Sequence, residues 1–180
     1  RPNCKWSARA GWAVIQINSD GTLGISSFGC LPILEQDNNA AEIWAVLFWL
    51  QHLDPCVQSV VLYSDSQIAV DGFINLLGVT RADQPYASIW RSILEAVGEL
   101  AGVTLSVTKV PAHISVEAAS ARGPAGLHRR AGNRWADLLA KAGAARHPDG
   151  PARPTMHCLF YPSDAADDPL PLLHLARRLL

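Results

Sequence analysis

The stretch Ser59–Phe73, SVVLYSDSQIAVDGF, decides the fold class. Its first part, Val60 to Tyr63, is a β-branched and aromatic run with the length of a buried strand. Asp65 follows that strand, and Gln67 to Phe73 has helix-like apolar spacing. This order predicts an α/β fold with Asp65 at the carboxyl end of a strand, where open α/β sheets bind ligands. In the plainer interpretation, Asp65 or Ser66 only caps the helix.

The composition is that of a chain with one core and no strong overall charge. It has 180 residues, 49% of them hydrophobic, and a net charge of -1, so no global field recruits nucleic acid. No apolar run reaches about 18 residues, so no membrane segment is expected. Four widely spaced cysteines argue against a zinc site or a disulfide framework and favour an intracellular, reducing compartment. A start at Arg1 suggests a piece of a longer protein.

Two strands are expected before the Asp65 stretch. Residues 10–18 alternate in the manner of a strand with one buried face, and residues 22–33 supply the returning strand. The sequence Ser19-Asp20-Gly21 between them predicts a hairpin turn, because Asp-Gly tolerates the positive φ angles of tight turns. Gly24 and Gly29 are candidate bulges in the second strand.

A helix is predicted over residues 40–53, and it is apolar on nearly every side. Glu42 is the exceptional residue in it. Because Asn39 and Glu42 have the spacing of a capping box, the plainer interpretation makes Glu42 part of the helix cap.

The chain after the Asp65 stretch alternates between helix and strand. We expect a loop over residues 76–84, a helix over 86–100 and a strand over 103–110 that ends in Pro111-Ala112-His113. Residues 114–131 show no periodicity and predict an irregular segment.

A last helix is predicted over residues 133–144, with Asp137 in its first turn, where the helix dipole favours an acid. The apolar residues expected to point inward are Trp135, Leu138, Leu139 and Ala142. From residue 146 the chain reads as a proline-rich linker, followed by a short strand at 156–161 and a short helix at 170–180.

Four motifs occur in a fixed order along the chain. They are Ala41-Glu42, Ser64-Asp65-Ser66-Gln67, Val110-Pro111-Ala112-His113 and Gly132-Asn133-x-x-Ala136-Asp137. In this order they resemble the ribonuclease H family, especially the ribonuclease H domains of reverse transcriptases from non-LTR retroelements. The resemblance implies an α/β ribonuclease H-like fold, a mixed sheet flanked by helices. Residues 1–145 would form this domain, N-terminally incomplete, and residues 146–180 a linker and C-terminal extension.

The resemblance also implies a chemistry. Enzymes of this family hydrolyse a phosphodiester with two Mg²⁺ ions about 4 Å apart. Transferred by motif, Glu42, Asp65 and Asp137 would be catalytic ligands of Mg²⁺ or Mn²⁺, and His113 would assist proton transfer or product release. The implied partner is an RNA/DNA hybrid or RNA, and the domain would belong to a larger polyprotein or assembly.

One departure from the family concerns its first strand, which is the centre of the sheet and carries the first acid upstream of the glycine matching Gly11. A chain without that acid should bind the metal pair poorly, and Asp20 at a hairpin tip is a poor substitute. Because a central strand's backbone groups must be paired, something should occupy its place. The candidates are a segment preceding Arg1, another chain added by β-augmentation, or residues 157–161 folded back with Asp164 near the missing acid.

The second departure is an insertion, because 18 residues separate His113 from Gly132. From Lys109 to Arg146 there are seven Lys and Arg residues against two acids. Such an excess suits salt-dependent phosphate contacts, and the candidates are Arg122, Arg129, Arg130 and Arg134. The alternative is a solvated, flexible insertion.

Two functions therefore remain open. One is a metal-dependent endonuclease that cuts RNA in RNA/DNA hybrids. The other is a catalytically inactive ribonuclease H-like domain that serves as a structural or RNA-binding subunit of a larger assembly.

Overall fold

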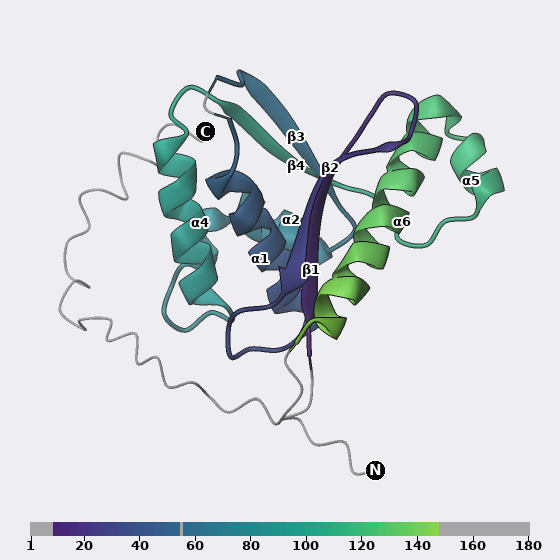
Figure 1. The fold of residues 1–180 in the computed structure, drawn as a ribbon. Coiled ribbons are helices and arrows are strands. Elements are labelled where there is room, and N and C mark those ends of the chain that lie inside the picture. Colours follow the sequence, from purple (N-terminus) through teal and green to yellow (C-terminus); the bar gives the residue numbers. More distant parts are fainter. Residues whose placement is uncertain (1–8, 55, 148–180) are drawn as a thin grey trace, which may run out of the picture.

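The structure, a computed structural model, describes residues 9–54 and 56–147 (Figure 1). The elements in chain order are β1 (Gly11–Ile17), β2 (Leu23–Cys30), α1 (Asn38–Gln51), β3 (Ser59–Ser64), α2 (Gln67–Ile74), α3 (Leu76–Val79), α4 (Ala87–Glu99), β4 (Thr104–Lys109), α5 (Val116–Ser120) and α6 (Gly123–Ala145). The predicted α/β class is confirmed. The expected strand at 156–161 and helix at 170–180 lie outside the described residues.

Strands β1 and β2 form the expected antiparallel hairpin. Its turn contains Gly21 at φ +82°, and the Asp20 carboxylate accepts hydrogen bonds from the backbone N–H and the hydroxyl of Thr22. The register shifts opposite Ile15 and Ile17, so the bulge predicted at Gly24 is present. The bulge predicted at Gly29 is wrong, because this residue pairs in regular register with Trp12.

Strands β3 and β4 pair in parallel, from Ser59 beside Thr104 to Ser64 beside Lys109. Among the described residues, β1 and β2 form one two-stranded sheet and β3 and β4 form another, with no ladder between them. This arrangement agrees with the expected fold, in which a central strand upstream of Gly11 would join the two pairs. Which of the three candidate segments supplies that strand stays a prediction.

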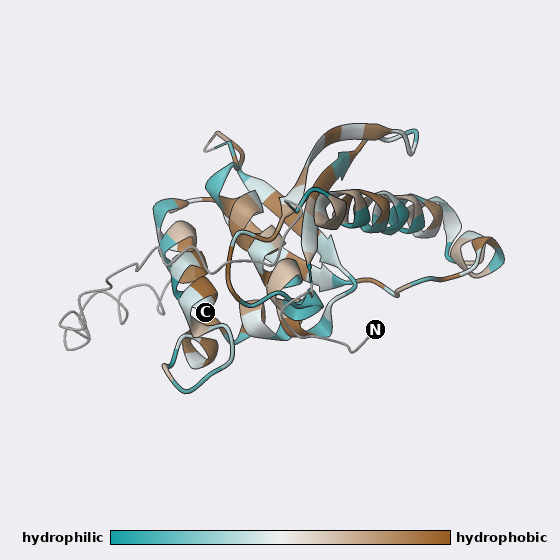
Figure 2. Cartoon of the chain, turned by 60° about the horizontal axis from the view of Figure 1, so that its bottom comes forward, coloured by the Kyte–Doolittle hydropathy of each residue, from teal (hydrophilic) through white to brown (hydrophobic). Residues whose placement is uncertain are grey.

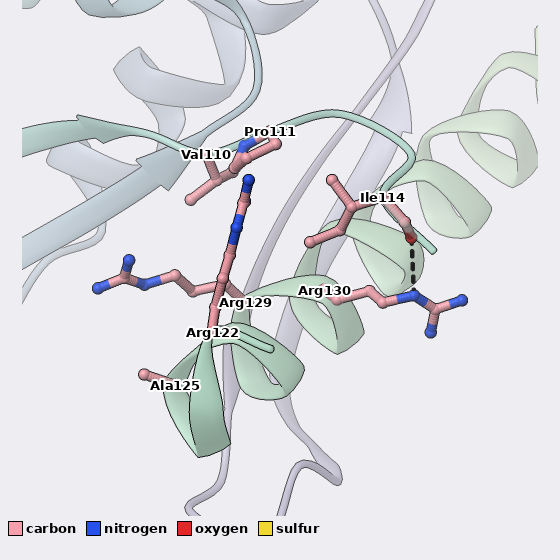
Figure 3. Close-up of a pocket in the computed structure, with 8 residues that line it drawn as sticks. Val110, Pro111, Ile114, Arg122, Ala125, Arg129 and Arg130 are labelled. Atoms are coloured by element: carbon pink, nitrogen blue, oxygen red, sulfur yellow. Dashed lines mark hydrogen bonds between the residues drawn. The ribbon is translucent and has the colours of Figure 1, made fainter. Parts of the chain in front are cut away.

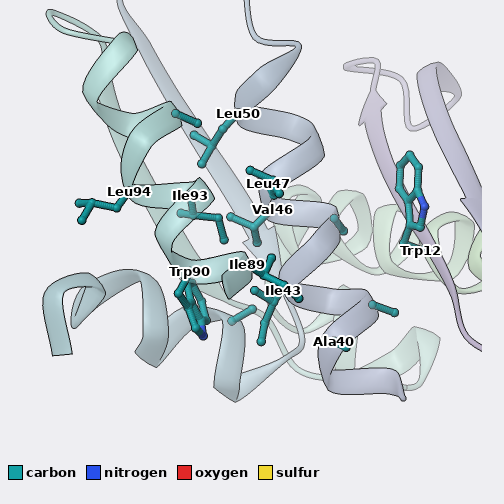
Figure 4. Packing of buried hydrophobic residues seen from close by; sticks show 14 of the residues in the cluster. Trp12, Ala40, Ile43, Val46, Leu47, Leu50, Ile89, Trp90, Ile93 and Leu94 are labelled. Carbon is teal, nitrogen blue, oxygen red and sulfur yellow. The ribbon is translucent and has the colours of Figure 1, made fainter. Parts of the chain in front are cut away.

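The core lies between helices α1 and α4 and extends under β1 (Figure 4). Ile43 and Val46 of α1 meet Ile93 and Trp90 of α4, and the Trp90 side chain is only 1% exposed. Figure 2 shows that the apolar residues of these helices lie on their inner sides and the polar residues on their outer sides. Burial of such side chains provides the main stabilising free energy of the domain.

The second half of the chain differs from the prediction in two places. The expected loop 76–84 begins with the short helix α3, and the segment 114–131 is largely helical rather than irregular, because it holds α5 and the first turns of α6. Within residues 9–54 and 56–147, no helix is long and apolar enough to cross a membrane.

Helix α6 packs on the β1–β2 hairpin through its smallest residues. A Cβ atom on Gly143 would lie 2.3 Å from the carbonyl oxygen of Gly29, and one on Gly11 would lie 2.1 Å from that of Ala140. Backbone approach of this kind leaves no room for large side chains. The expected inward placement of Trp135, Leu138 and Ala142 is therefore wrong, and the Trp135 and Leu138 side chains are 37% and 55% exposed.

We predict that Gly143→Ala destabilises the fold much more than Gly132→Ala, although both glycines lie in α6. The Gly143 methyl group would meet rigid backbone of β2, whereas the Gly132 methyl group would lie 3.2 Å from the movable end of Ile17. Overpacking of this kind costs about 1–3 kcal/mol, and alanine in a helix gains about 1 kcal/mol over glycine. Urea unfolding of the full chain, followed by circular dichroism, measures both. Equal losses would contradict the packing described for α6.

Candidate active site

Asp65 follows β3 directly, and its carboxylate is not a helix cap. The cap of α2 is Ser66, whose hydroxyl accepts a hydrogen bond from the backbone N–H of Ala69 at 3.3 Å. The Asp65 carboxylate instead accepts a hydrogen bond from the side-chain amide of Asn133 on α6, at 2.9 Å. A carboxylate at a strand end is thus held by a helix that is distant in the sequence.

Glu42 lies in the second turn of α1 and is likewise not part of a cap. The capping-box interpretation is wrong, because α1 begins earlier and is capped by Asp37, whose carboxylate accepts from the backbone N–H of Ala40 at 2.8 Å. The pKa of Glu42 is raised from 4.5 to about 7, mainly by burial and then by the negative charges of Asp65 and Asp137, against the opposing charge of Lys109. Three carboxyl groups from three different elements therefore share one electrostatic environment.

Asp137 lies in the middle of α6 and faces the loop that follows β4. Because α6 begins at Gly123 rather than near residue 133, the prediction that Asp137 occupies a first helical turn is wrong. The carboxylate of Asp137 lies 3.6 Å from Nδ1 of His113. His113 is exposed and has φ +48°, a left-handed conformation that is uncommon for residues other than glycine.

Two residues of this site were not predicted as functional. Lys109 ends β4 and donates a hydrogen bond from its ammonium group to the backbone carbonyl of Asp65, and Asn133 orients the Asp65 side chain. The parallel pairing of Ser64 with Lys109 brings the two strand ends together. A sequence signal existed for both, because Lys109 precedes the Val-Pro-Ala-His motif and Asn133 belongs to the Gly-Asn motif.

The chemistry of the donor set suits Mg²⁺, which prefers hard oxygen ligands from a few carboxylates and retains several waters. Glu42 is largely buried, and the charges of Asp65 and Asp137 add to the rise of its pKa. Among the described residues, however, no group of three or more His, Cys, Asp or Glu side chains is close enough to hold an ion. The site thus has ligands of the right type that are not gathered into one coordination shell.

The predicted phosphate-binding residues fall into two places. Arg122, Arg129 and Arg130 line a hollow between α6 and the loop that follows β4 (Figure 3). Arg134 lies further along α6, is exposed, and does not line the hollow. The insertion that carries three of these arginines is helical rather than irregular, and most of its residues are exposed, as the alternative of a solvated insertion expects.

Comparison with known proteins identifies the class to which this fold and site belong. The family model described as RNase H matches residues 4–145. The chain therefore belongs to the RNase H family.

The solved structures that resemble the chain include two from the same virus. The solution structure of the PFV RNase H domain is 20% identical, with a TM-score of 0.50, over 81% of this chain and 87% of that one. The crystal structure of the native Prototype Foamy Virus protease-reverse transcriptase is 17% identical, with a TM-score of 0.49, over 78% of this chain and 20% of that one. The first likeness supports the fold. No curated protein matches the chain significantly.

The raised pKa of Glu42 makes stability depend on pH in the absence of metal. The folded state binds the Glu42 proton more tightly than the unfolded state, so the stabilisation is complete below about pH 4.5 and is lost as pH rises toward 7. We predict that Glu42→Gln removes this pH dependence. In the wild type, the free energy of unfolding should fall by at most about 3 kcal/mol over this pH range, at 1.36 kcal/mol per pKa unit.

Urea unfolding of the full chain in EDTA, between pH 4.5 and 8, measures the slope. The exposed Glu95 on α4 provides a matched control, and Glu95→Gln should keep the wild-type slope. A Glu42→Gln protein whose stability falls with pH as steeply as the wild type would show that Glu42 does not carry the effect.

Proposed function

We propose that this chain is the ribonuclease H domain of a retroelement-type reverse transcriptase, related to those of non-LTR elements, and that it cuts RNA in RNA/DNA hybrids. The observation that carries this proposal is the convergence of Glu42, Asp65 and Asp137, one from each of three elements, in one electrostatic environment. Membership in the RNase H family supports hydrolysis of a phosphodiester as the reaction. Within the larger protein, the domain would act beside a polymerase.

In this proposal Glu42, Asp65 and Asp137 hold Mg²⁺ or Mn²⁺. The bound metal would activate the attacking water and neutralise charge on the scissile phosphate. Asn133 holds the Asp65 carboxylate in one orientation, which limits the conformational entropy lost when that carboxylate binds a cation. Lys109, bonded to the Asp65 backbone, keeps a positive charge beside the acids.

His113 would assist proton transfer or product release. Its imidazole lies 3.6 Å from the Asp137 carboxylate and is 78% exposed, so it is open to water. An imidazole can act as a general acid, which suits proton transfer to a leaving oxygen. The substrate backbone would be contacted by Arg122, Arg129, Arg130 and Arg134.

One observation favours a second candidate function. Within residues 9–54 and 56–147, the acids do not form a three-ligand cluster. A domain that never closes this cluster would be a catalytically inactive member of the family, retained as a structural or RNA-binding subunit of a larger assembly. The enzyme is the better-supported proposal, because Glu42, Asp65 and Asp137 lie in one electrostatic environment and the chain belongs to the RNase H family.

We predict that the full chain cleaves the RNA strand of a labelled RNA/DNA hybrid in Mg²⁺ and that Asp65→Asn lowers the rate by at least about 10²-fold. The substitution removes a ligand charge and preserves the shape of the side chain. Asp83→Asn is the matched control, because Asp83 pairs with Arg81 at an exposed site on the surface, where such pairs contribute little. Gel analysis of the RNA products measures the rates.

The outcome separates the two candidate functions. Cleavage that is lost in Asp65→Asn and kept in Asp83→Asn supports the enzyme. Absence of cleavage by a chain that is folded by circular dichroism would reject it and favour the structural or RNA-binding subunit.

A further inference from the structure

The insertion of this chain builds a basic hollow beside the acids. Its floor is formed by Val110, Pro111 and Ile114, and its charged side by arginines of the α5–α6 region (Figure 3). Gly126 allows this region to pack tightly, because a Cβ atom there would lie 2.4 Å from the carbonyl oxygen of Ala119 in α5. The hollow is therefore a packed feature of two helices and a loop.

Two of the arginines are held in place by contacts that leave hydrogen-bond donors free. The guanidinium carbon of Arg129 lies 4.8 Å from the centre of the Tyr63 ring, a stacking contact that uses the face of the guanidinium and leaves its N–H edges available. Arg130 donates from Nε to the carbonyl oxygen of Ile114 at 2.9 Å, which fixes the loop after β4. Arg122 extends toward Pro111 between the other two (Figure 3).

In the part of the chain that the structure describes, Arg122, Arg129 and Arg130 form no ion pair. The acid whose pKa responds to Arg130 is Glu117 in the first turn of α5, and its pKa is lowered mainly by hydrogen bonds from its own backbone N–H and from the Ser115 hydroxyl, with a smaller contribution from Arg130. The Glu117 carboxylate therefore interacts mainly with groups at the start of α5 and only weakly with the arginines.

We propose that Arg122 and Arg129 bind one phosphate of the nucleic-acid backbone in this hollow, while Arg130 positions the loop. Planar guanidinium groups with free N–H edges match phosphate oxygens. The inference rests on the proposed nucleic-acid substrate and names the group by which that substrate is held outside the acid cluster.

The position of the hollow relates this phosphate to the cleavage site. Arg129 and Asn133 are four residues apart on α6, a rise of about 6 Å, and Asn133 bonds the candidate metal ligand Asp65. Tyr63, under Arg129, is two residues before Asp65 on the chain. The phosphate held by these arginines would therefore lie on the same side of the domain as the candidate metal ligand Asp65.

The test measures binding of the full chain to a fluorescent RNA/DNA hybrid by anisotropy, in EDTA and at several salt concentrations. We expect Arg129→Gln and Arg122→Gln each to weaken binding several-fold and to lower the salt slope by about one unit, the effect of one lost phosphate contact. Arg146→Gln is a closely matched control, because Arg146 follows α6 at its other end and stacks over Phe28 at 4.2 Å. It should leave the slope unchanged. Arg129→Lys, which keeps the charge without the planar fork, should weaken binding less than Arg129→Gln.

Two results would overturn the assignment. Equal effects of Arg129→Gln and Arg146→Gln would mean that only overall charge matters. No effect of Arg129→Gln would mean that the hollow binds no phosphate of the hybrid.

A cleavage assay in Mg²⁺ on the same hybrid separates this inference from the proposed function. Cleavage together with equal effects of Arg129→Gln and Arg146→Gln would reject only the phosphate site. Selective loss of binding in Arg129→Gln by a chain that does not cleave would support the phosphate site and reject the hydrolase.

Discussion

The close approach of α6 to the β1–β2 hairpin is the constraint on which the site depends. Gly11 and Gly143 allow backbone to meet backbone, and this contact determines where the rest of the helix lies. Asn133, Asp137 and Arg129 then project from α6 toward β3 and the loop after β4. The geometry of a polar site is thus set by glycine packing that lies outside it.

A second constraint comes from the backbone of the sheet. Among the described residues, β1 pairs with β2 alone and β3 with β4 alone, so the inner edges of the two pairs have no ladder partner. Contact between the two strand pairs passes instead through α1 and α2, because α1 packs on β1 and on α2, and α2 packs on β3 and β4. It also passes through the Asn133–Asp65 hydrogen bond. A side-chain hydrogen bond fixes the distance between the two pairs less firmly than a continuous ladder of backbone hydrogen bonds would. Among residues 9–54 and 56–147, the three acids interact electrostatically without forming a three-ligand cluster.

Local signals predicted the fold class and the position of Asp65, because a β-branched run followed by an acid and a helix is a pattern within a few residues. The start of α6 could not be predicted in this way. Its first turns read Gly-Pro-Ala-Gly, a poor helix sequence by intrinsic propensity, and the helix is held by its contact with α5 and with the hairpin. Because α6 packs on the hairpin closely, its small residues face the hairpin. The apolar residues Trp135 and Leu138 therefore predicted the wrong side of the helix as the buried one.

The roles of the three acids in the candidate site also depend on tertiary structure rather than on neighbouring residues in the sequence. Each acid had a plausible local role as a cap or a dipole partner, and the structure rejects these roles because Asp37 and Ser66 are the caps and Asp137 lies in mid-helix. Burial disfavours the charged form of a carboxyl group that no cap hydrogen bond stabilises. In Glu42 this effect is seen as a raised pKa. The burial of Glu42 beside Asp65 and Asp137 is therefore a tertiary feature that no spacing rule along the sequence could have established.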